Sequence, residues 1–214
     1  MHVSLTGKGH KRFAAFWDWA VKRENKAARD MRREVVGGAR GRVLELGVGV
    51  GANWPFLPAG IDYTGIEPDP YMVDRARRHA AEAGEDHTLL QAPAEALPFP
   101  DHDFDTVIVT LTLCTVDDLD LALAEAMRVL KPGGEFRFAE HVRARNRLGS
   151  LLQDLVAPPW RWFGAGCNLN RRTGDAIREA GLDLVELRTW RQGFIPMITG
   201  VARAPGQPPQ SSDG

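Results

Sequence analysis

Glycine residues recur at every second position directly after a short apolar segment. The apolar segment is 43–46, and the glycines are Gly47, Gly49 and Gly51. Glycine has no Cβ, so its backbone adopts positive φ and lets a ligand approach closely. A strand, a glycine-rich turn and a helix N-terminus together commonly hold a cofactor that carries a nucleotide. The sequence therefore predicts such a cofactor at this turn.

Two classes of cofactor fit the turn. Gly47, Gly49 and Ala52 match the dinucleotide pattern G-x-G-x-x-G/A, and Glu67 follows about twenty residues later, where an acid that binds ribose is expected. This reading predicts a nicotinamide-dependent oxidoreductase. Glu45 favours the other class, because a carboxylate at the mouth of the turn attracts an ammonium or sulfonium group and repels a pyrophosphate.

Alternating strands and helices are expected to position these residues. Apolar and β-branched runs predict strands at 42–46, 62–66, 87–91, 106–109, 135–140, 183–190 and 196–203. Helical spacing predicts helices at 10–36, 52–57, 69–84, 117–130, 148–157 and 171–180. Repeated strand–helix units imply a parallel sheet covered on both faces, with ligands bound beyond the carboxyl ends of its strands.

Proline and capping residues set the expected helix ends. Asp69 followed by proline begins one helix, and Gly84 ends it. Pro158 and Pro159 are expected to end the helix that starts at 148. Asn170 is expected to cap the last helix.

The chain is expected to form one cofactor-binding domain over 37–204, after an N-terminal segment, 1–36, and before a disordered tail, 205–214. The N-terminal segment holds one amphipathic helix, whose apolar residues recur from Phe13 to Val35 and whose remaining surface is rich in arginine and lysine. Three interpretations stay open for this helix: packing on the sheet, a lid over the cofactor, or a basic face that contacts anionic membrane.

Composition narrows the class of protein. A net charge of −1 over 214 residues gives no reason to expect nucleic acid as a partner. Two cysteines do not make a disulfide framework, and no signal peptide or bilayer-spanning run is recognised, so a cytoplasmic protein is expected. The spacing of histidine, cysteine and acidic residues indicates no metal site, and the oligomeric state is not indicated.

Four motifs in a fixed order carry a family resemblance. They are E-x-G-x-G-x-G at 45–51, A-E-A-L-P-F at 94–99, F-D-x-V at 104–107 and L-K-P-G-G at 130–134. Over roughly residues 35–203 this set resembles the class I methyltransferases that use S-adenosylmethionine (SAM). The resemblance implies an α/β, Rossmann-like fold with a seven-stranded, mostly parallel sheet, helices on both faces and an antiparallel last strand.

The same resemblance assigns cofactor contacts. It implies that Glu45, Gly47 and Gly51 surround the methionine part of SAM, that Glu67 binds the ribose hydroxyls, and that Ala94 and Glu95 flank the adenine. Gly49, Asn53, Pro68, Met72 and Thr110 complete the expected cofactor-binding set. Ala92 and Pro93 stand where the family usually has Gly-Asp, so Glu95 or a backbone carbonyl is expected to replace the aspartate that often binds the adenine amino group.

A narrower resemblance concerns the methyl acceptor. Residues 109–116, 140–142, 157–160 and 166–169 look like the methyltransferase-like family of thiol S-methyltransferases, whose bacterial relatives are grouped with phospholipid or quinone methyltransferases. It implies a small, lipophilic acceptor, with a thiol as the first hypothesis. N-methylation of a phospholipid headgroup, methylation of a quinone precursor and a non-catalytic SAM-binding partner are the alternatives.

Four residues are candidates for the acceptor side. His141 follows the strand at 135–140 and is the candidate catalytic base, with a capping hydrogen bond as its alternative role. Cys114, Cys167 and Asn168 are candidate substrate contacts. A small, buried apolar role is the alternative for Cys114, and Cys167 is expected in a loop that closes the acceptor side.

Overall fold

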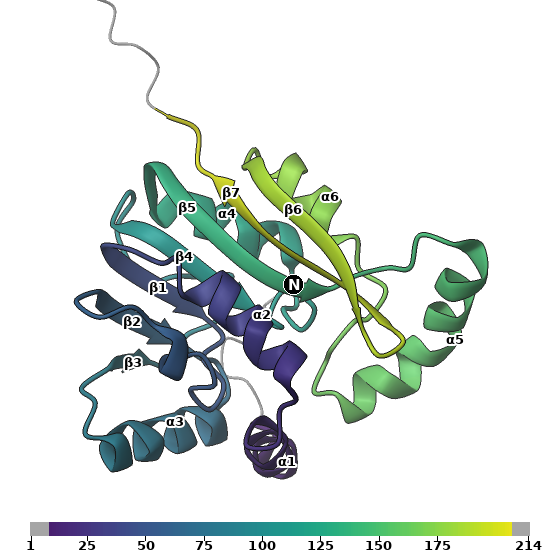
Figure 1. Ribbon diagram of the computed structural model, residues 1–214, viewed down its shortest axis with the longest axis horizontal. Coiled ribbons are helices and arrows are strands. Elements are labelled where there is room, and N and C mark those ends of the chain that lie inside the picture. The colour runs from purple at the N-terminus through teal and green to yellow at the C-terminus, as the bar shows by residue number, and fades with distance from the viewer. Residues whose placement is uncertain (1–8, 207–214) are drawn as a thin grey trace, which may run out of the picture.

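The computed structural model describes residues 9–206, which form a seven-stranded sheet in the order β3-β2-β1-β4-β5-β7-β6 (Figure 1). The strands are β1 (Arg42–Leu46), β2 (Asp62–Ile66), β3 (Thr88–Leu90), β4 (Phe104–Thr110), β5 (Leu130–His141), β6 (Asp183–Gln192) and β7 (Ile195–Arg203). Strands β1 to β5 pair in parallel, and β7 is antiparallel to β5 and β6. The predicted Rossmann-like fold is confirmed.

Helices cover both faces of the sheet. They are α1 (Lys11–Val21), α2 (Lys26–Val36), the 3₁₀ turn η1 (Trp54–Phe56), α3 (Pro70–Ala83), α4 (Leu119–Val129), α5 (Arg147–Phe163) and α6 (Thr173–Glu179). Side chains alternate across each strand, so Val43 and Ile108 pack with α2 and α3, whereas Leu44 and Val107 pack with α4 and α6. This alternation also sends Glu45 to the face that carries α2 and η1.

The N-terminal segment departs from the prediction of one helix over 10–36. The structure has two helices, α1 and α2, separated by a turn at 22–25. Asn25 interrupts the predicted single helix, because its side chain accepts a hydrogen bond from the Ala28 N–H, 3.0 Å away, and so caps the start of α2. Residues 1–8 lie outside the described residues.

Two predictions near the C-terminus were also wrong. Helix α5 continues through Pro158 and Pro159 to Phe163. Each proline removes one helical hydrogen bond, but no residue of α5 is buried, so water can solvate the freed carbonyls. Helix α6 begins at Thr173 without a side-chain cap, and Asn170 instead donates to Asp154 of α5 at 2.8 Å.

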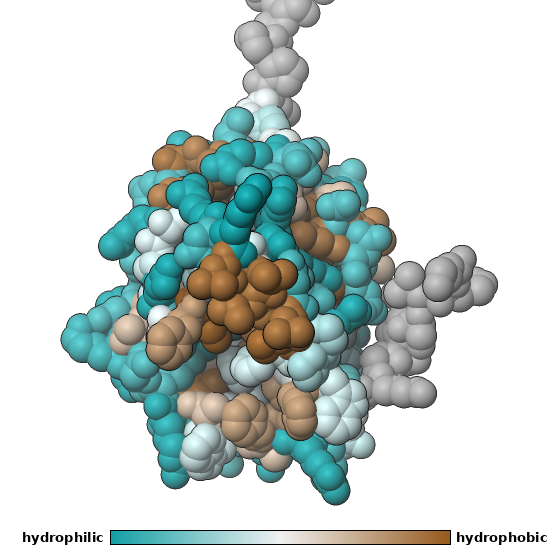
Figure 2. Space-filling view, turned by 90° about the vertical axis from the view of Figure 1, so that its right-hand side faces the viewer, coloured by the Kyte–Doolittle hydropathy of each residue, from teal (hydrophilic) through white to brown (hydrophobic). Residues whose placement is uncertain are grey.

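Helix α5 stands apart from the body of the molecule (Figure 1). Figure 2 views this side, where apolar side chains gather on the surface. Those of α5 that are exposed are Leu148, Leu151, Leu152, Leu155, Val156, Trp160, Trp162 and Phe163, and Phe194 at the turn between β6 and β7 is also exposed. Among the described helices, none combines the length and the apolar character needed to cross a bilayer. Of the tail predicted to be disordered, 207–214 lie outside the described residues.

Candidate active site at the carboxyl ends of the strands

The glycine turn follows β1 and adopts left-handed backbone geometry. Gly47 and Gly49 have φ values of 74° and 59°. A side chain at Gly47 would also collide with Thr112 in the loop after β4, so two loops meet here without a Cβ between them. The N–H groups of Gly47 and Val48 donate to the Ile66 carbonyl at 2.9 and 3.0 Å, which ties the turn to the end of β2.

Glu67 lies directly after β2 and faces the turn. Its Oε2 accepts the Gly49 N–H at 2.9 Å, and its Oε1 accepts the Asp69 N–H at 3.0 Å. Burial raises the pKa of Glu67 to about 7, although both backbone hydrogen bonds act in the opposite direction. Each oxygen keeps acceptor capacity for a further donor, so the carboxylate can accept from two neighbouring hydroxyls.

Glu45 is buried beneath the turn, not at its mouth as the sequence suggested. It is 1% exposed; its Oε2 accepts from the Tyr63 hydroxyl at 2.6 Å and its Oε1 from Asn53 Nδ2 at 2.8 Å. Burial raises the pKa of Glu45 to about 7. The alternation of β1 explains this position, because Glu45 shares the face of Val43. Glu45 therefore reaches the turn through Asn53.

A buried arginine that sequence reasoning assigned to the surface completes this network. Arg32 of α2 is 2% exposed, and its Nη1 donates to Asn53 Oδ1 at 2.8 Å and to Thr110 Oγ1 at 3.3 Å. Its Nη2 pairs with Glu24 at 2.6 Å. The missed signal was helical spacing, because Arg32 lies on the same face as the buried Ala28 and Val35.

The N-terminal helix covers the cofactor turn from outside. Met72 of α3 is buried with Ala14 of α1 and Val50 of the turn, and Trp17 packs against this group. The nearest neighbour of a Cβ placed on Gly49 would be the indole nitrogen of Trp17, at 3.5 Å. Helix α1 therefore lies where a lid or a packing segment would lie.

The residues expected around the adenine, Ala94 and Glu95, lie in the loop between β3 and β4. Ala94 is buried. The carboxylate of Glu95 accepts the N–H groups of Asp117 at 2.8 Å and Asp118 at 3.3 Å, so it is tied to the N-terminus of α4. The Pro68 carbonyl accepts from Gln91 at 3.3 Å. Glu95 thus has a structural role here, beside its predicted one.

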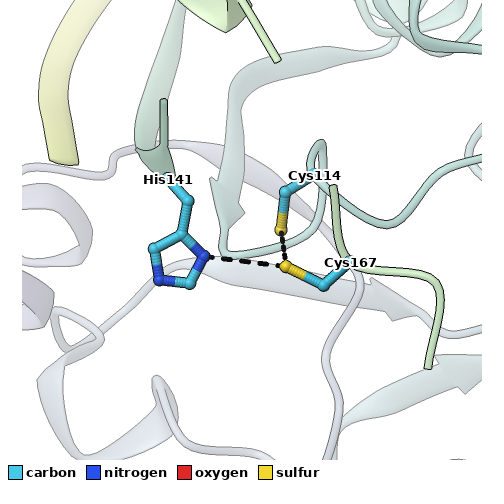
Figure 3. A group of neighbouring side chains, drawn as sticks. All are labelled: Cys114, His141 and Cys167. Carbon is cyan, nitrogen blue, oxygen red and sulfur yellow. Dashed lines mark hydrogen bonds between the residues drawn. The ribbon is translucent and has the colours of Figure 1, made fainter. Parts of the chain in front are cut away.

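Three side chains from distant segments meet beyond the ends of β4 and β5 (Figure 3). The sulfur of Cys167 lies 3.5 Å from the sulfur of Cys114 and 3.8 Å from Nδ1 of His141. Both cysteines are buried and His141 is partly exposed. The Cys114 thiol and His141 lower the pKa of Cys167 to about 5, whereas the same thiol–thiol contact and burial raise the pKa of Cys114. Sequence spacing gave no sign of this convergence.

Neighbouring groups hold this cluster in place. The Asn168 N–H and side-chain amide both donate to the Cys114 carbonyl, at 2.7 and 3.2 Å. The buried carboxylate of Glu140 accepts the N–H groups of Thr112 and Leu113 at 2.8 Å and of Cys114 at 3.2 Å. Leu111 takes a φ of 58° at the start of this loop. Asn168 therefore positions Cys114, and Glu140 is a positioning residue that sequence reasoning missed.

The chain is similar to several known proteins. A family model for a methyltransferase domain matches residues 44–138. Thiol S-methyltransferase TMT1A from Homo sapiens is 30% identical over 200 residues, covering 82% of both chains. Thiol S-methyltransferase TMT1B from Rattus norvegicus is 35% identical over 149 residues, covering 68% of this chain and 61% of that protein. The chain thus spans about three fifths of the rat protein.

Other relatives carry different names. Phosphatidylethanolamine N-methyltransferase from Cereibacter sphaeroides is 32% identical, covering 66% of this chain and 70% of that protein. The ubiquinone/menaquinone biosynthesis C-methyltransferase UbiE from Hahella chejuensis is 43% identical over 55% of each chain. Among solved structures, the [4+2]-cyclase SpnF superposes with a TM-score of 0.69 at 20% identity, covering 84% of this chain and 80% of that one. This last likeness shows the fold alone.

Proposed function

Because this chain belongs to the class I SAM-dependent methyltransferases, we propose that it transfers the methyl group of SAM to a small, lipophilic thiol. The observation that carries the thiol is the sulfur-lined region around His141, whose imidazole is partly exposed at the carboxyl end of β5. Relatives named as thiol S-methyltransferases support this choice. Because the chain belongs to this family, we set aside the interpretations as a nicotinamide-dependent oxidoreductase and as a non-catalytic SAM-binding protein.

The cofactor is SAM, and we assign its contacts from the geometry of the turn. Glu67 accepts hydrogen bonds from the two ribose hydroxyls with the acceptor capacity that Gly49 and Asp69 leave free. Asn53 and Thr110, joined by a 2.9 Å hydrogen bond, lie with the glycine turn around the methionine part. Ala94 and Glu95 flank the adenine, as the family resemblance implies.

The main requirement of methyl transfer is a nucleophile that is aligned with the methyl group of SAM. Methyl transfer from a sulfonium is an in-line displacement, and holding both reactants aligned contributes up to about 7–11 kcal/mol in favourable systems. A free thiol with a pKa of about 8.5 is only a few per cent thiolate at neutral pH. We assign His141 the role of favouring that thiolate, as the proton acceptor for a thiol bound beside it.

Lipophilic acceptors fit the surface next to this site. The loop that carries Cys167 and Asn168 directly follows α5, whose exposed face is apolar (Figure 2). Residues 143–172 contain six arginines and one acid, Asp154, which pairs with Arg143 at 2.6 Å. An apolar helix face bordered by arginines is typical of a segment that lies at the surface of an anionic bilayer.

We therefore propose a peripheral membrane contact through α5. The sequence pointed to the basic N-terminal helix for this role, but α1 uses Ala14 and Trp17 to pack over the cofactor turn. Helix α5 has no buried residue and so keeps its apolar face available. Such a contact would bring the acceptor loop close to substrates dissolved in the membrane.

An acceptor screen tests the proposal. The full chain is incubated with methyl-labelled SAM and, in separate reactions, alkyl thiols, phosphatidylethanolamine vesicles and a demethylated quinone, and products are identified by mass spectrometry. We expect labelled methyl thioethers, and none with the Glu67→Ala variant. Labelled lipid amine or quinone without any labelled thioether would refute the thiol and favour the corresponding alternative.

A further inference from the structure

The grouping of Cys114, His141 and Cys167 has the composition of a metal site. The three donor atoms lie within 4.8 Å of one another, and they come from the loop after β4, the end of β5 and the loop after α5. Building on the proposed thiol methylation, we propose that these side chains bind a zinc ion whose fourth position receives the acceptor thiol. Two cysteines, one histidine and one open position form a donor set known from catalytic zinc sites.

The separations of the donor atoms fit a tetrahedral ion. Zinc–sulfur bonds of about 2.3 Å and zinc–nitrogen bonds of about 2.05 Å place two sulfurs about 3.8 Å apart and a sulfur and a nitrogen about 3.6 Å apart. The structure has 3.5 Å between the sulfurs of Cys114 and Cys167, and 3.8 Å between Cys167 and His141. The third pair, Cys114 and His141, lies within 4.8 Å, so its donor atoms would have to approach by up to about 1.2 Å to reach a sulfur–nitrogen separation of about 3.6 Å.

The surroundings hold the donors as metal ligands are usually held. Asn168 and Glu140 fix the backbone of Cys114 from both sides. Arg171 fixes the same loop, with its guanidinium donating to the carbonyls of Leu113 at 2.5 Å and Val116 at 2.6 Å. Ligand positions supported by a surrounding shell of hydrogen bonds are a common property of metal sites. Two thiolates also balance the charge of Zn²⁺, which matters because both cysteines are buried.

Burial differs among the donors in a way that leaves one side open. Cys114 and Cys167 are enclosed, whereas His141 is partly exposed at the carboxyl edge of the sheet. β4, whose loop carries Cys114, lies between β1 with its glycine turn and β5 with His141. An ion held here would border the partly exposed side of His141, and this is the side from which we infer that an exogenous thiol completes its coordination.

The chemical step balances without a change of oxidation state. The acceptor thiol binds zinc as a thiolate and releases its proton to water. A sulfur electron pair then forms a bond to the methyl carbon of SAM while the bond from that carbon to the sulfonium breaks. The electrons of the broken bond stay on the departing S-adenosylhomocysteine. The methyl thioether is a neutral, weaker ligand and leaves. In the zinc-bound protein His141 is a metal ligand and not the proton acceptor, and the zinc ion favours the thiolate instead.

Metal analysis tests the site independently of turnover. The full chain, without a histidine tag, is purified from zinc-supplemented cultures, and zinc is measured by mass spectrometry. We expect about one zinc per chain, at least tenfold less in Cys167→Ser and His141→Gln, and an unchanged content in His102→Asn. His102 is an exposed histidine with a φ of 57°, a conformation that asparagine tolerates. Binding of S-adenosylhomocysteine verifies that each variant is folded.

Three outcomes would overturn the site. The first is a zinc content below a tenth of an equivalent, together with no uptake of zinc by the reduced protein from micromolar Zn²⁺. The second is zinc that stays bound when a proposed ligand is replaced. The third is a metal-free protein in which the two cysteines form a disulfide.

Cobalt substitution tests the fourth position. We expect the sulfur-to-cobalt absorption of the Co²⁺ protein to rise when an alkyl thiol is added. No spectral change under conditions in which thiols are methylated would overturn the open position. Bound metal with no thiol methylation would instead refute the proposed function and leave the metal site standing.

Discussion

The guanidinium of Arg32 lies 2.8 Å from the side-chain oxygen of Asn53, although one residue belongs to an N-terminal helix and the other to the turn after β1. Through this bond and the contact with Thr110, α2 reaches the carboxyl edge of the sheet. The N-terminal segment is thus joined to the cofactor side of the domain by a buried charge, with Glu24 as its partner.

Arg32→Ala should destabilise the protein strongly. The change leaves the Glu24 carboxylate and the side-chain oxygen of Asn53 without their donor, and removing one partner of a buried ion pair typically costs about 3–5 kcal/mol. Urea unfolding followed by circular dichroism measures the loss. Arg33→Ala is the matched control, because Arg33 is exposed beside Asp30, and its removal should leave the midpoint almost unchanged. Equal midpoints for the two variants would contradict the buried role of Arg32.

Glu67→Gln should weaken the binding of S-adenosylhomocysteine by about a hundredfold. An amide loses the charge that strengthens the hydrogen bonds from the ribose hydroxyls, and two charge-assisted bonds together contribute about 3 kcal/mol. Titration calorimetry measures the dissociation constant. Glu82→Gln, an exposed change on α3, should leave it unaltered. Wild-type affinity in folded Glu67→Gln protein would exclude Glu67 as the ribose ligand.

Cofactor affinity should fall as the pH drops below about 7. In the free protein, burial raises the pKa of both Glu67 and Glu45 to about 7, whereas the ribose hydroxyls require Glu67 as a carboxylate. Below that pH, binding must first remove a proton, so affinity decreases by up to tenfold per pH unit for each coupled group. Calorimetry from pH 5.5 to 8 gives the slope of the logarithm of the association constant against pH. This slope should be smaller by up to one in Glu67→Gln than in the wild type. An unchanged slope would be inconsistent with the raised pKa of Glu67.

The same raised pKa values predict an opposite trend for the stability of the free protein. A carboxyl whose pKa is higher in the folded state than in the unfolded state stabilises the fold most below the unfolded pKa of 4.5. Its contribution is lost as the pH rises to about 7. For the wild type, the free energy of unfolding should therefore fall over this interval by more than for Glu67→Gln, as measured by urea titration at several pH values.

Replacing two leucines on α5 should weaken attachment to vesicles. Leu151 and Leu155 are 67% and 74% exposed, so changing both to glutamate leaves the fold intact while removing apolar area and adding negative charge. Burial of one such side chain is worth about 1.5–3 kcal/mol, so partitioning onto phosphatidylglycerol vesicles should drop at least a hundredfold in sedimentation assays. Leu121→Glu, an exposed leucine on α4, should bind as the wild type does. Loss of binding in Leu121→Glu alone would place the contact on another face.

Local signals allowed much of the sheet to be predicted. β1 and β2 begin and end at the predicted residues, because their apolar runs are bounded by glycine or acidic residues. Helix α3 begins after Asp69, whose side chain accepts the Tyr71 N–H, and ends at Gly84 with a φ of 69°. Each of these features depends on residues adjacent in sequence, so the sequence alone was sufficient to find them.

The features that the sequence did not reveal depend on burial or on distant segments. Arg32 and Lys26 look alike in a basic helix, yet only Arg32 points to the interior, where Asn53 and Glu24 satisfy its charge. The meeting of Cys114 with Cys167 joins residues 53 positions apart, and no local pattern encodes that contact. The continuation of α5 past its prolines depends on the exposure of this helix to solvent, which cannot be read from the amino-acid sequence of the helix.

Because Glu140 holds three amide hydrogens of the segment that carries Cys114, this wall of the acceptor site is fixed to the central sheet. Helix α5, which leads into the loop that carries Cys167, itself has no buried residue. Exchanging α5 for a helix of different shape should therefore alter which acceptors are admitted while leaving folding intact, which makes this helix the natural place to redirect the enzyme to other substrates.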